Sequence, residues 1–197
     1  MKSYLPRILM WIASLSLLVL FLFPIWKITL KAPQYPDGIS MYIWINQITG
    51  DSEYTLQNIN ILNHYVGMKY IEPDSIPELT YFPYIIIGLC LLGLALSFFK
   101  NNRFYLVYSL ILIMVCVLGL YDFYLWEYDY GHDLSDKAPI KVPGMAYQPP
   151  LFGSKMLLNF EAISYPHTGA LFMGISIVLS FLSFFIGKKR KAPKAFA

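Results

Sequence analysis

The stretch Tyr81–Tyr124 reads YFPYIIIGLCLLGLALSFFKNNRFYLVYSLILIMVCVLGLYDFY and holds two long apolar runs separated by the short polar segment Lys100–Arg103. A helix that spans a bilayer needs about 20 mostly apolar residues, and both runs, Tyr81–Phe99 and Phe104–Tyr124, meet that requirement. Because the polar segment is so short, the two helices must be antiparallel neighbours. The stretch therefore predicts a transmembrane helical hairpin.

Two further apolar runs, Ile8–Ile28 and Thr168–Gly187, lie on either side of this hairpin. The composition is typical of a membrane protein, because 57% of the residues are hydrophobic and only 14% are charged, against about 25% charged residues in soluble proteins. The first run follows a basic start and is too long for a cleaved signal peptide, which indicates a retained signal anchor. We therefore predict an all-α membrane protein with four transmembrane helices.

Charge is distributed unequally among the segments that separate these runs. All twelve acidic residues and all three histidines lie in, or at the edge of, the two long connecting segments. The other three polar segments are basic and contain no Asp or Glu, and such segments stay in the cytoplasm. Both termini are therefore expected in the cytoplasm and both long segments outside it. The basic set comprises Lys2, Arg7, Lys100, Arg103, Lys188, Lys189, Arg190, Lys191 and Lys194.

The two long segments are expected to fold together into an extracytoplasmic cap with some β-structure. The first opens with a turn at Pro36–Gly38, continues as a strand over Ile39–Ile48, and then forms a short helix over Tyr54–Met68. The second is rich in proline, which favours turns and extended chain. The predicted organisation is a signal anchor (1–30), the first cap segment (31–80), the hairpin (81–124), the second cap segment (125–167), and the last helix with its basic tail (168–197).

Several possible ligands of a soft metal lie in the cap segments. His64 and Met68 are four residues apart, so on a helix they face the same way. Imidazole and thioether together suit Cu(I) and, to a lesser degree, Cu(II). We therefore consider a copper site made by His64 and Met68 with His132 and Met145, while Met156 and His167 are further donors. The alternative, in which the histidines form ordinary hydrogen bonds and the methionines fill the core, remains open at this point.

Other chemistries are less well supported. Asp129, His132, Asp133 and Asp136 form an acidic cluster that suggests a calcium site, but its spacing lacks the ligand order and the closing Glu of an EF-hand, and a solvated loop is the favoured interpretation. We find no glycine-rich phosphate loop, no Gly-x-Ser-x-Gly and no His-Glu-x-x-His, so we expect no enzyme and no catalytic residues. The basic tail directly follows an apolar run, which favours contact with anionic lipid over nucleic acid.

Three segments of the sequence resemble segments of a known group of proteins. INILNHYVGM (Ile59–Met68), WEYDYGHD (Trp126–Asp133) and KVPGMAYQPP (Lys141–Pro150) resemble small bacterial membrane proteins associated with nitrous-oxide-reductase accessory genes. The resemblance extends over nearly the whole chain. It implies a bacterial inner membrane protein that assists copper delivery to, or assembly of, a periplasmic copper enzyme. The implied partners are a periplasmic copper chaperone or the cuproenzyme itself.

Two hypotheses therefore come from different functional classes. In the first, the protein is a copper-handling accessory protein that binds Cu(I) on its outer face. In the second, it is a scaffold without metal, whose cap docks a partner protein through exposed aromatic residues such as Tyr42, Trp44 and Tyr147. The first predicts that the donor atoms of His64, His132 and Met145 converge in the folded protein.

Overall fold

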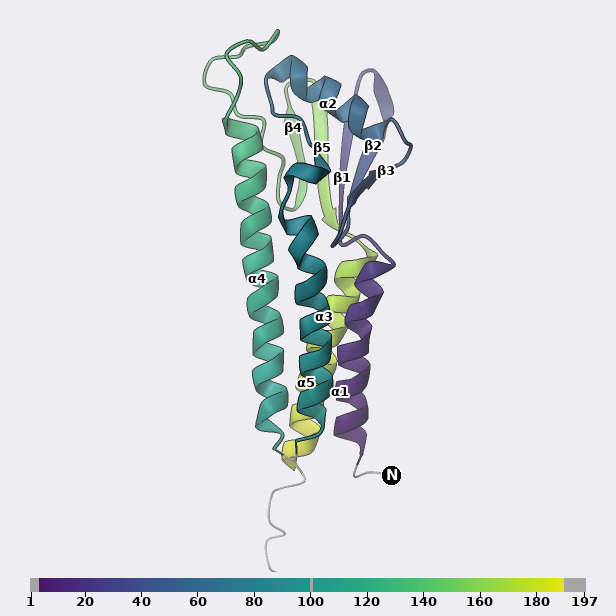
Figure 1. Ribbon diagram of the computed structural model, residues 1–197. Coiled ribbons are helices and arrows are strands. Elements are labelled where there is room, and N and C mark those ends of the chain that lie inside the picture. Colours follow the sequence, from purple (N-terminus) through teal and green to yellow (C-terminus); the bar gives the residue numbers. More distant parts are fainter. Residues whose placement is uncertain (1–3, 100, 190–197) are drawn as a thin grey trace, which may run out of the picture.

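The computed structural model of the protein describes residues 4–99 and 101–189. A bundle of long helices forms one half of the molecule, and a sheet with a crossing helix forms a cap on the bundle (Figure 1). The bundle consists of α1 (Leu5–Ser16) with its 3-10 continuation η1 (Leu17–Phe21), α3 (Glu78–Ser97), α4 (Arg103–His132) and α5 (Thr168–Lys189).

The prediction of an all-α protein with four transmembrane helices is wrong. Among the described residues, three helices, α3, α4 and α5, are long and apolar enough to cross a membrane. The first apolar run instead forms a shorter helical segment that ends at Phe21. After Pro24, which has no backbone N–H to donate, the chain enters a strand at Trp26. The run Ile8–Ile28 suggests a single helix because hydropathy alone does not separate a helix from a buried strand that follows it.

An antiparallel sheet with the strand order β3-β2-β1-β5-β4 forms the cap, so the fold is mixed α/β. The central strand β1 pairs with β2 on one side and with β5 on the other, which places Ile28 between Met41 and Ser164. Because β5 comes from the second connecting segment, this pairing joins both segments into one sheet. The strands are β1 (Trp26–Ala32), β2 (Tyr35–Ile43), β3 (Ile48–Gly50), β4 (Gly153–Leu157) and β5 (Phe160–Pro166).

The first connecting segment differs in detail from the prediction. The predicted strand Ile39–Ile48 is divided into β2 and β3 by a turn, in which the backbone N–H of Trp44 donates to the carbonyl of Gln47 at 2.9 Å. The predicted turn at Pro36–Gly38 lies inside β2. There Gly38 has a φ of 84°, which glycine adopts far more readily than other residues, and the register with β1 shifts opposite it.

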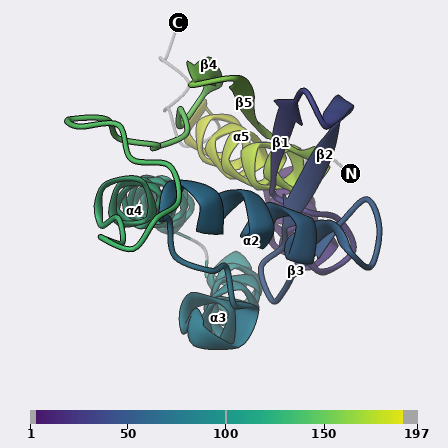
Figure 2. The same cartoon turned by 90° about the horizontal axis from the view of Figure 1, so that it is seen from above.

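The predicted helix of the first segment is confirmed as α2 (Thr55–Val66), which crosses one face of the sheet (Figure 2). It ends at Gly67, whose φ of 84° forms the left-handed cap that commonly terminates helices. The apolar face of α2, including Ile59, packs onto the sheet and closes the core of the cap. Other buried members of this core are Trp26, Ile28, Leu30, Met41, Ile48, Val66, Ile71, Tyr130, Tyr147, Leu157 and Ala162.

Helix α4 is longer than the hydrocarbon core of a bilayer is thick. Its 30 residues correspond to about 45 Å at 1.5 Å per residue, against about 30 Å for the hydrocarbon core of a membrane. The surplus is at the C-terminal end, where Phe123, Trp126 and Tyr130 pack against the core of the cap. The part of α4 beyond Tyr124 therefore belongs to the cap and lies outside the membrane-spanning segment.

Small polar side chains connect the helices of the bundle. The hydroxyl of Ser176 on α5 donates to the carbonyl of Ala13 on α1 at 2.7 Å. The hydroxyl of Ser109 on α4 donates to that of Ser180 on α5 at 2.8 Å. Small residues allow close approach of helices in lipid, and hydrogen bonds between them add to the stability. Helix α5 thus links α1 and α4 within the bundle.

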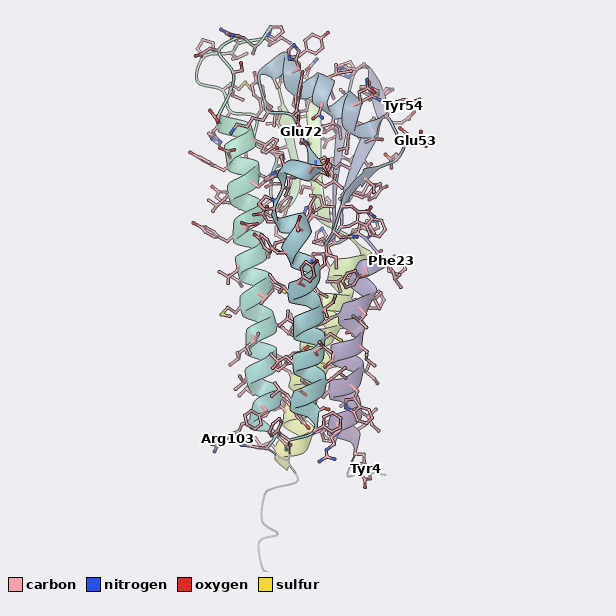
Figure 3. The ribbon with its side chains drawn as sticks, in the orientation of Figure 1. Tyr4, Phe23, Glu53, Tyr54, Glu72 and Arg103 are labelled. Atoms are coloured by element: carbon pink, nitrogen blue, oxygen red, sulfur yellow. The ribbon has the colours of Figure 1, made fainter. Side chains whose placement is uncertain are left out.

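The basic residues predicted to face the cytoplasm gather at one end of the bundle. Arg103 begins α4 and Tyr4 precedes α1, and Figure 3 shows both at the end away from the cap. The acidic Glu53 and Glu72 lie in the cap at the opposite end (Figure 3). Of the predicted basic set, Lys2, Lys100, Arg190, Lys191 and Lys194 lie outside the described residues.

Candidate functional site

His64 and Met68, two of the four predicted copper ligands, line the same surface hollow of about 300 Å³. His64 lies in the last turn of α2, and Met68 follows the capping residue Gly67. The imidazole Nδ1 of His64 is 3.4 Å from the hydroxyl oxygen of Tyr70. The chain therefore brings one nitrogen donor and one sulfur donor to the same hollow, but Met68 is half-buried, packs against the core of the cap and also lines the inner cavity.

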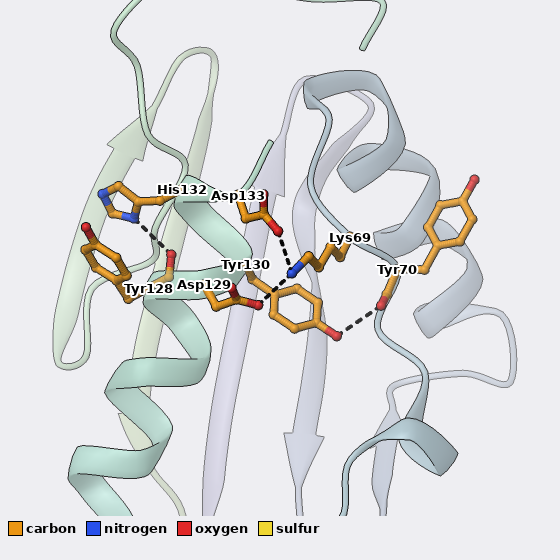
Figure 4. A network of polar contacts seen from close by, with 7 residues as sticks. All are labelled: Lys69, Tyr70, Tyr128, Asp129, Tyr130, His132 and Asp133. Carbon is orange, nitrogen blue, oxygen red and sulfur yellow. Dashed lines mark hydrogen bonds and ion pairs between the residues drawn. The ribbon is translucent and has the colours of Figure 1, made fainter. Parts of the chain in front are cut away.

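His132 and Met145, the other two predicted ligands, do not line this hollow. The ring of His132 stacks on Tyr128 with 3.9 Å between centroids, and its Nδ1 is 2.9 Å from the carbonyl oxygen of Tyr128. Figure 4 shows this pair on the side of α4 that faces away from Lys69. Met145 packs against the core of the cap. Within residues 4–99 and 101–189, no group of three or more His, Cys, Asp or Glu side chains is placed to hold a metal ion.

The two remaining donors named from the sequence lie on other elements. Met156 is 64% exposed on the edge strand β4. His167 immediately precedes α5, and its ring meets the ring of Tyr42 edge-on with 5.5 Å between centroids. The Nδ1 of His167 is buried and has no hydrogen-bond partner in the described part of the chain. Both residues thus belong to the sheet region and not to the surface around α2.

Two acids of the predicted cluster, Asp129 and Asp133, pair with a lysine from the other cap segment. The Nζ of Lys69 lies 2.8 Å from Oδ2 of Asp129 and 2.7 Å from Oδ2 of Asp133 (Figure 4). Hydrogen bonds to these two carboxylates raise the pKa of Lys69. Beside them, the hydroxyl of Tyr130 donates to the carbonyl of Tyr70 at 3.0 Å. The connection between α2 and α3 is thereby fastened to the end of α4.

Glu127 on α4 is a candidate functional residue that the sequence analysis missed. Its side chain is completely buried, and neither carboxyl oxygen has a hydrogen-bond partner among the described residues. Burying an unpaired carboxyl group is costly, and such groups concentrate at functional sites. One feature of the sequence indicates that Glu127 points into the cap. Glu127 follows Phe123 by four residues and precedes Tyr130 by three, so it shares their inward face of the helix.

Glu127 lines a cavity of about 50 Å³ enclosed between the sheet, α2 and α4. The wall is mostly apolar, but it includes Tyr147, whose hydroxyl is buried and has no hydrogen-bond partner among the described residues. Burial in these surroundings raises the pKa of Glu127 to about 8, because the charged form loses its hydration. At neutral pH the protonated form therefore predominates. The site can release a proton, accept a cation, or exchange hydrogen bonds with a small ligand.

Comparison with known proteins finds no family model that matches the chain and no curated protein with significant similarity to it. The resemblance to accessory proteins of nitrous-oxide reductase therefore stays a prediction. The same holds for the expected lack of enzymatic activity.

Proposed function

We propose that the protein is a membrane-anchored docking subunit whose cap binds a partner protein through the outer surface of α2. The supporting observation is a group of exposed apolar and aromatic side chains on the cap. We define the apical patch as Ile61, His64, Tyr65, Tyr70 and Ile140, all of which are exposed. Aromatic residues of this kind, with apolar neighbours, are the usual anchors of protein interfaces.

The apical patch is continuous across two segments that are far apart in the sequence. Ile61 and Tyr65 are one turn apart on α2, so they share a face. The ring of His64 lies 6.2 Å from the rings of both Tyr65 and Tyr70, measured between centroids. From the second segment, the backbone N–H of Ile140 donates to the carbonyl of Tyr65 at 2.9 Å. A surface held in place in this way loses little conformational entropy on binding.

The anchors chosen from the sequence fit this proposal less well. Tyr147 is only 1% exposed and faces the cavity, so it cannot contact a partner. Tyr42 and Trp44 are half-buried and bonded within the sheet region, where the Tyr42 hydroxyl donates to Asp51 at 2.9 Å and the indole of Trp44 to Thr49 at 2.9 Å. The exposed surface around α2 is therefore the better candidate.

The charge pattern supports an orientation for this subunit. We place the end with Arg7 and Arg103 in the cytoplasm and the cap outside, with α3, α4 and α5 crossing the bacterial inner membrane. The segments placed outside, residues 25–80 and 125–167, carry six lysines against eleven acidic residues. A partner with a basic rim around an apolar centre complements such a surface, because opposite charges steer association.

Photo-crosslinking in membranes of the source cells tests the docking proposal. A photoreactive amino acid replaces Tyr65 in the apical patch, and a matched control replaces Met156, which is exposed on β4. We expect one discrete adduct from position 65, none of that mass from position 156, and loss of the adduct when Ile61→Asp is added. Equal labelling from both positions, no adduct from position 65, or an adduct that survives Ile61→Asp would contradict the proposal.

Copper handling is the second candidate, supported by the shared hollow of His64 and Met68. A nitrogen and a sulfur donor provide two of the three or four ligands that a Cu(I) site needs. A partner such as a periplasmic copper chaperone or a cuproenzyme would supply the rest. A copper site shared with a partner in this way would not include His132 or Met145.

Competition for Cu(I) against a chromophoric chelator tests the copper proposal on the purified protein. We expect His64→Ala and Met68→Ala to lower the copper withheld from the chelator, whereas His132→Ala, a matched histidine control, leaves it unchanged. If the wild type withholds no copper, or if His132→Ala has the largest effect, copper binding in this hollow is excluded.

A further inference from the structure

The cavity that contains Glu127 holds an acid for which the protein supplies no counter-ion. Of the residues that line it, only Tyr130 and Tyr147 are also titratable, and none besides Glu127 can carry a negative or positive charge at neutral pH. These lining residues come from β1, β2, α2, the α2–α3 connection, α4, the second cap segment, β4 and β5. The nearby Lys69 is already paired with Asp129 and Asp133.

Aromatic rings surround the same space. Trp126, Tyr130, Tyr147 and Phe160 all line the cavity, and the rings of Trp126 and Tyr130 lie 4.3 Å apart between centroids. The faces of such rings attract cations, and sites that combine several rings with a carboxylate are suited to ammonium groups. A bare metal ion would find one carboxyl, the phenols of Tyr130 and Tyr147 and the amide of Asn63 here, with the Tyr130 hydroxyl and the Asn63 amide N–H already donating to backbone carbonyls. This is fewer than the six to eight oxygen ligands that a hard cation such as Ca²⁺ requires.

The size of the cavity limits the ligand. By the same measure a cavity of about 10–15 Å³ holds one water molecule, so about 50 Å³ accommodates a ligand of only a few non-hydrogen atoms. An ammonium ion and methylammonium have this size. Their N–H groups can donate to the two free oxygens of Glu127 and to the hydroxyl of Tyr147, which removes the unsatisfied groups of the cavity.

We infer that the cavity between the sheet, α2 and α4 is a binding site for a small primary ammonium ion, held by the Glu127 carboxylate, the Tyr147 hydroxyl and the surrounding aromatic rings. Binding exchanges a proton for the ammonium ion. The carboxyl proton of Glu127 leaves to solvent, and the cation takes its place beside the carboxylate. The site is independent of the apical patch, so it does not rest on the docking proposal.

Isothermal titration of the full-length protein in nanodiscs with methylammonium tests this inference. Measurements in buffers of different ionisation enthalpy count released protons, and we expect close to one proton per bound ion below about pH 7. Because the cation competes with a proton, the apparent affinity should rise about tenfold per pH unit until Glu127 is ionised. Methanol, a neutral molecule of similar size, should not bind measurably.

Three variants separate this site from non-specific binding. Glu127→Gln keeps the size of the side chain and should lower the affinity at least tenfold and abolish proton release. Tyr147→Phe, which removes only the hydroxyl, should weaken binding several-fold. Asp129→Asn is the matched control, because this acid is on the same helix but outside the cavity, and its affinity should equal that of the wild type. Equal heats for wild type and Glu127→Gln, equal binding of methanol, or binding without proton release would overturn the inference.

Discussion

Glu127 makes the stability of the cap depend on pH. The folded protein holds the Glu127 proton with a pKa of about 8, against 4.5 for the exposed group. Because the folded state binds this proton more tightly than the unfolded state, its contribution to stability is greatest at low pH and is lost as the pH rises between about 4.5 and 8. A difference of this size corresponds to an effect on the order of 5 kcal/mol.

We therefore predict that the cap of the wild type unfolds more easily at about pH 8.5 than at about pH 5. Glu127→Gln cannot ionise and should flatten this dependence, and Glu127→Leu should also raise the stability, because it removes an unsatisfied polar group. Thermal unfolding followed by near-ultraviolet circular dichroism across this range, without amines, measures the effect. A wild-type melting temperature that does not fall with pH would show that Glu127 is not ionised in this window.

At the scale of an element, the extension of α4 organises the cap. Its inward face carries Phe123, Trp126 and Tyr130 into the core, and its outward acids bind Lys69. The second cap segment also lies directly on it, where the backbone N–H of Tyr147 donates to the carbonyl of Gly131 at 2.9 Å. This close contact holds Tyr147 in the wall of the cavity.

Gly131→Ala should therefore destabilise the cap. An added Cβ would lie 2.4 Å from both the Cα and the N of Gln148, so backbone has to move, and overpacking of this kind costs about 1–3 kcal/mol. Gly119→Ala on the same helix is the control. A Cβ there meets nothing within 4 Å, and alanine favours a helix by up to about 1 kcal/mol. Denaturant unfolding in detergent compares the two, and equal stabilities would contradict the close packing.

At the scale of the whole molecule, the cap and the bundle are continuous. Helix α4 passes from one into the other, and β5 leads into α5 through His167, whose backbone N–H donates to the carbonyl of Ile25 at 2.9 Å. The bundle therefore sets the direction in which the cap points. With basic residues at the far end, the proposed orientation places the apical patch on the outer side of the membrane.

Cysteine labelling tests this orientation in intact cells. The native Cys90 and Cys116, which lie in α3 and α4, are first replaced by alanine. We then expect a maleimide that does not cross membranes to label Met156→Cys in the cap directly, and to label Asn101→Cys, between α3 and α4, only after the cells are opened. The reverse pattern would invert the proposed orientation.

The sequence by itself determined the parts of the molecule that depend on local pattern. Runs of apolar residues predicted the long helices α3, α4 and α5, and apolar spacing predicted α2. The placement of basic and acidic residues separated the two ends of the bundle. His64 and Met68 line the same hollow, but α2 ends at Val66 and Gly67 is left-handed, so the turn after the helix, and not helical spacing, brings Met68 beside His64.

Only the tertiary structure decided how distant segments meet. The pairing of β1 with β5 joins residues more than a hundred positions apart, and no local periodicity encodes which strands will pair. Without that sheet, Trp26 and Ile28 look like the end of a helix, and Glu127 looks like an ordinary charge in an acidic loop. The sheet and α2 enclose Glu127 together with Tyr147, whereas His132 turns to the other side of α4. Whether a side chain is buried depends on how the sheet, α2 and α4 pack together, and no single segment determines it. The cavity could therefore be found only in the folded molecule.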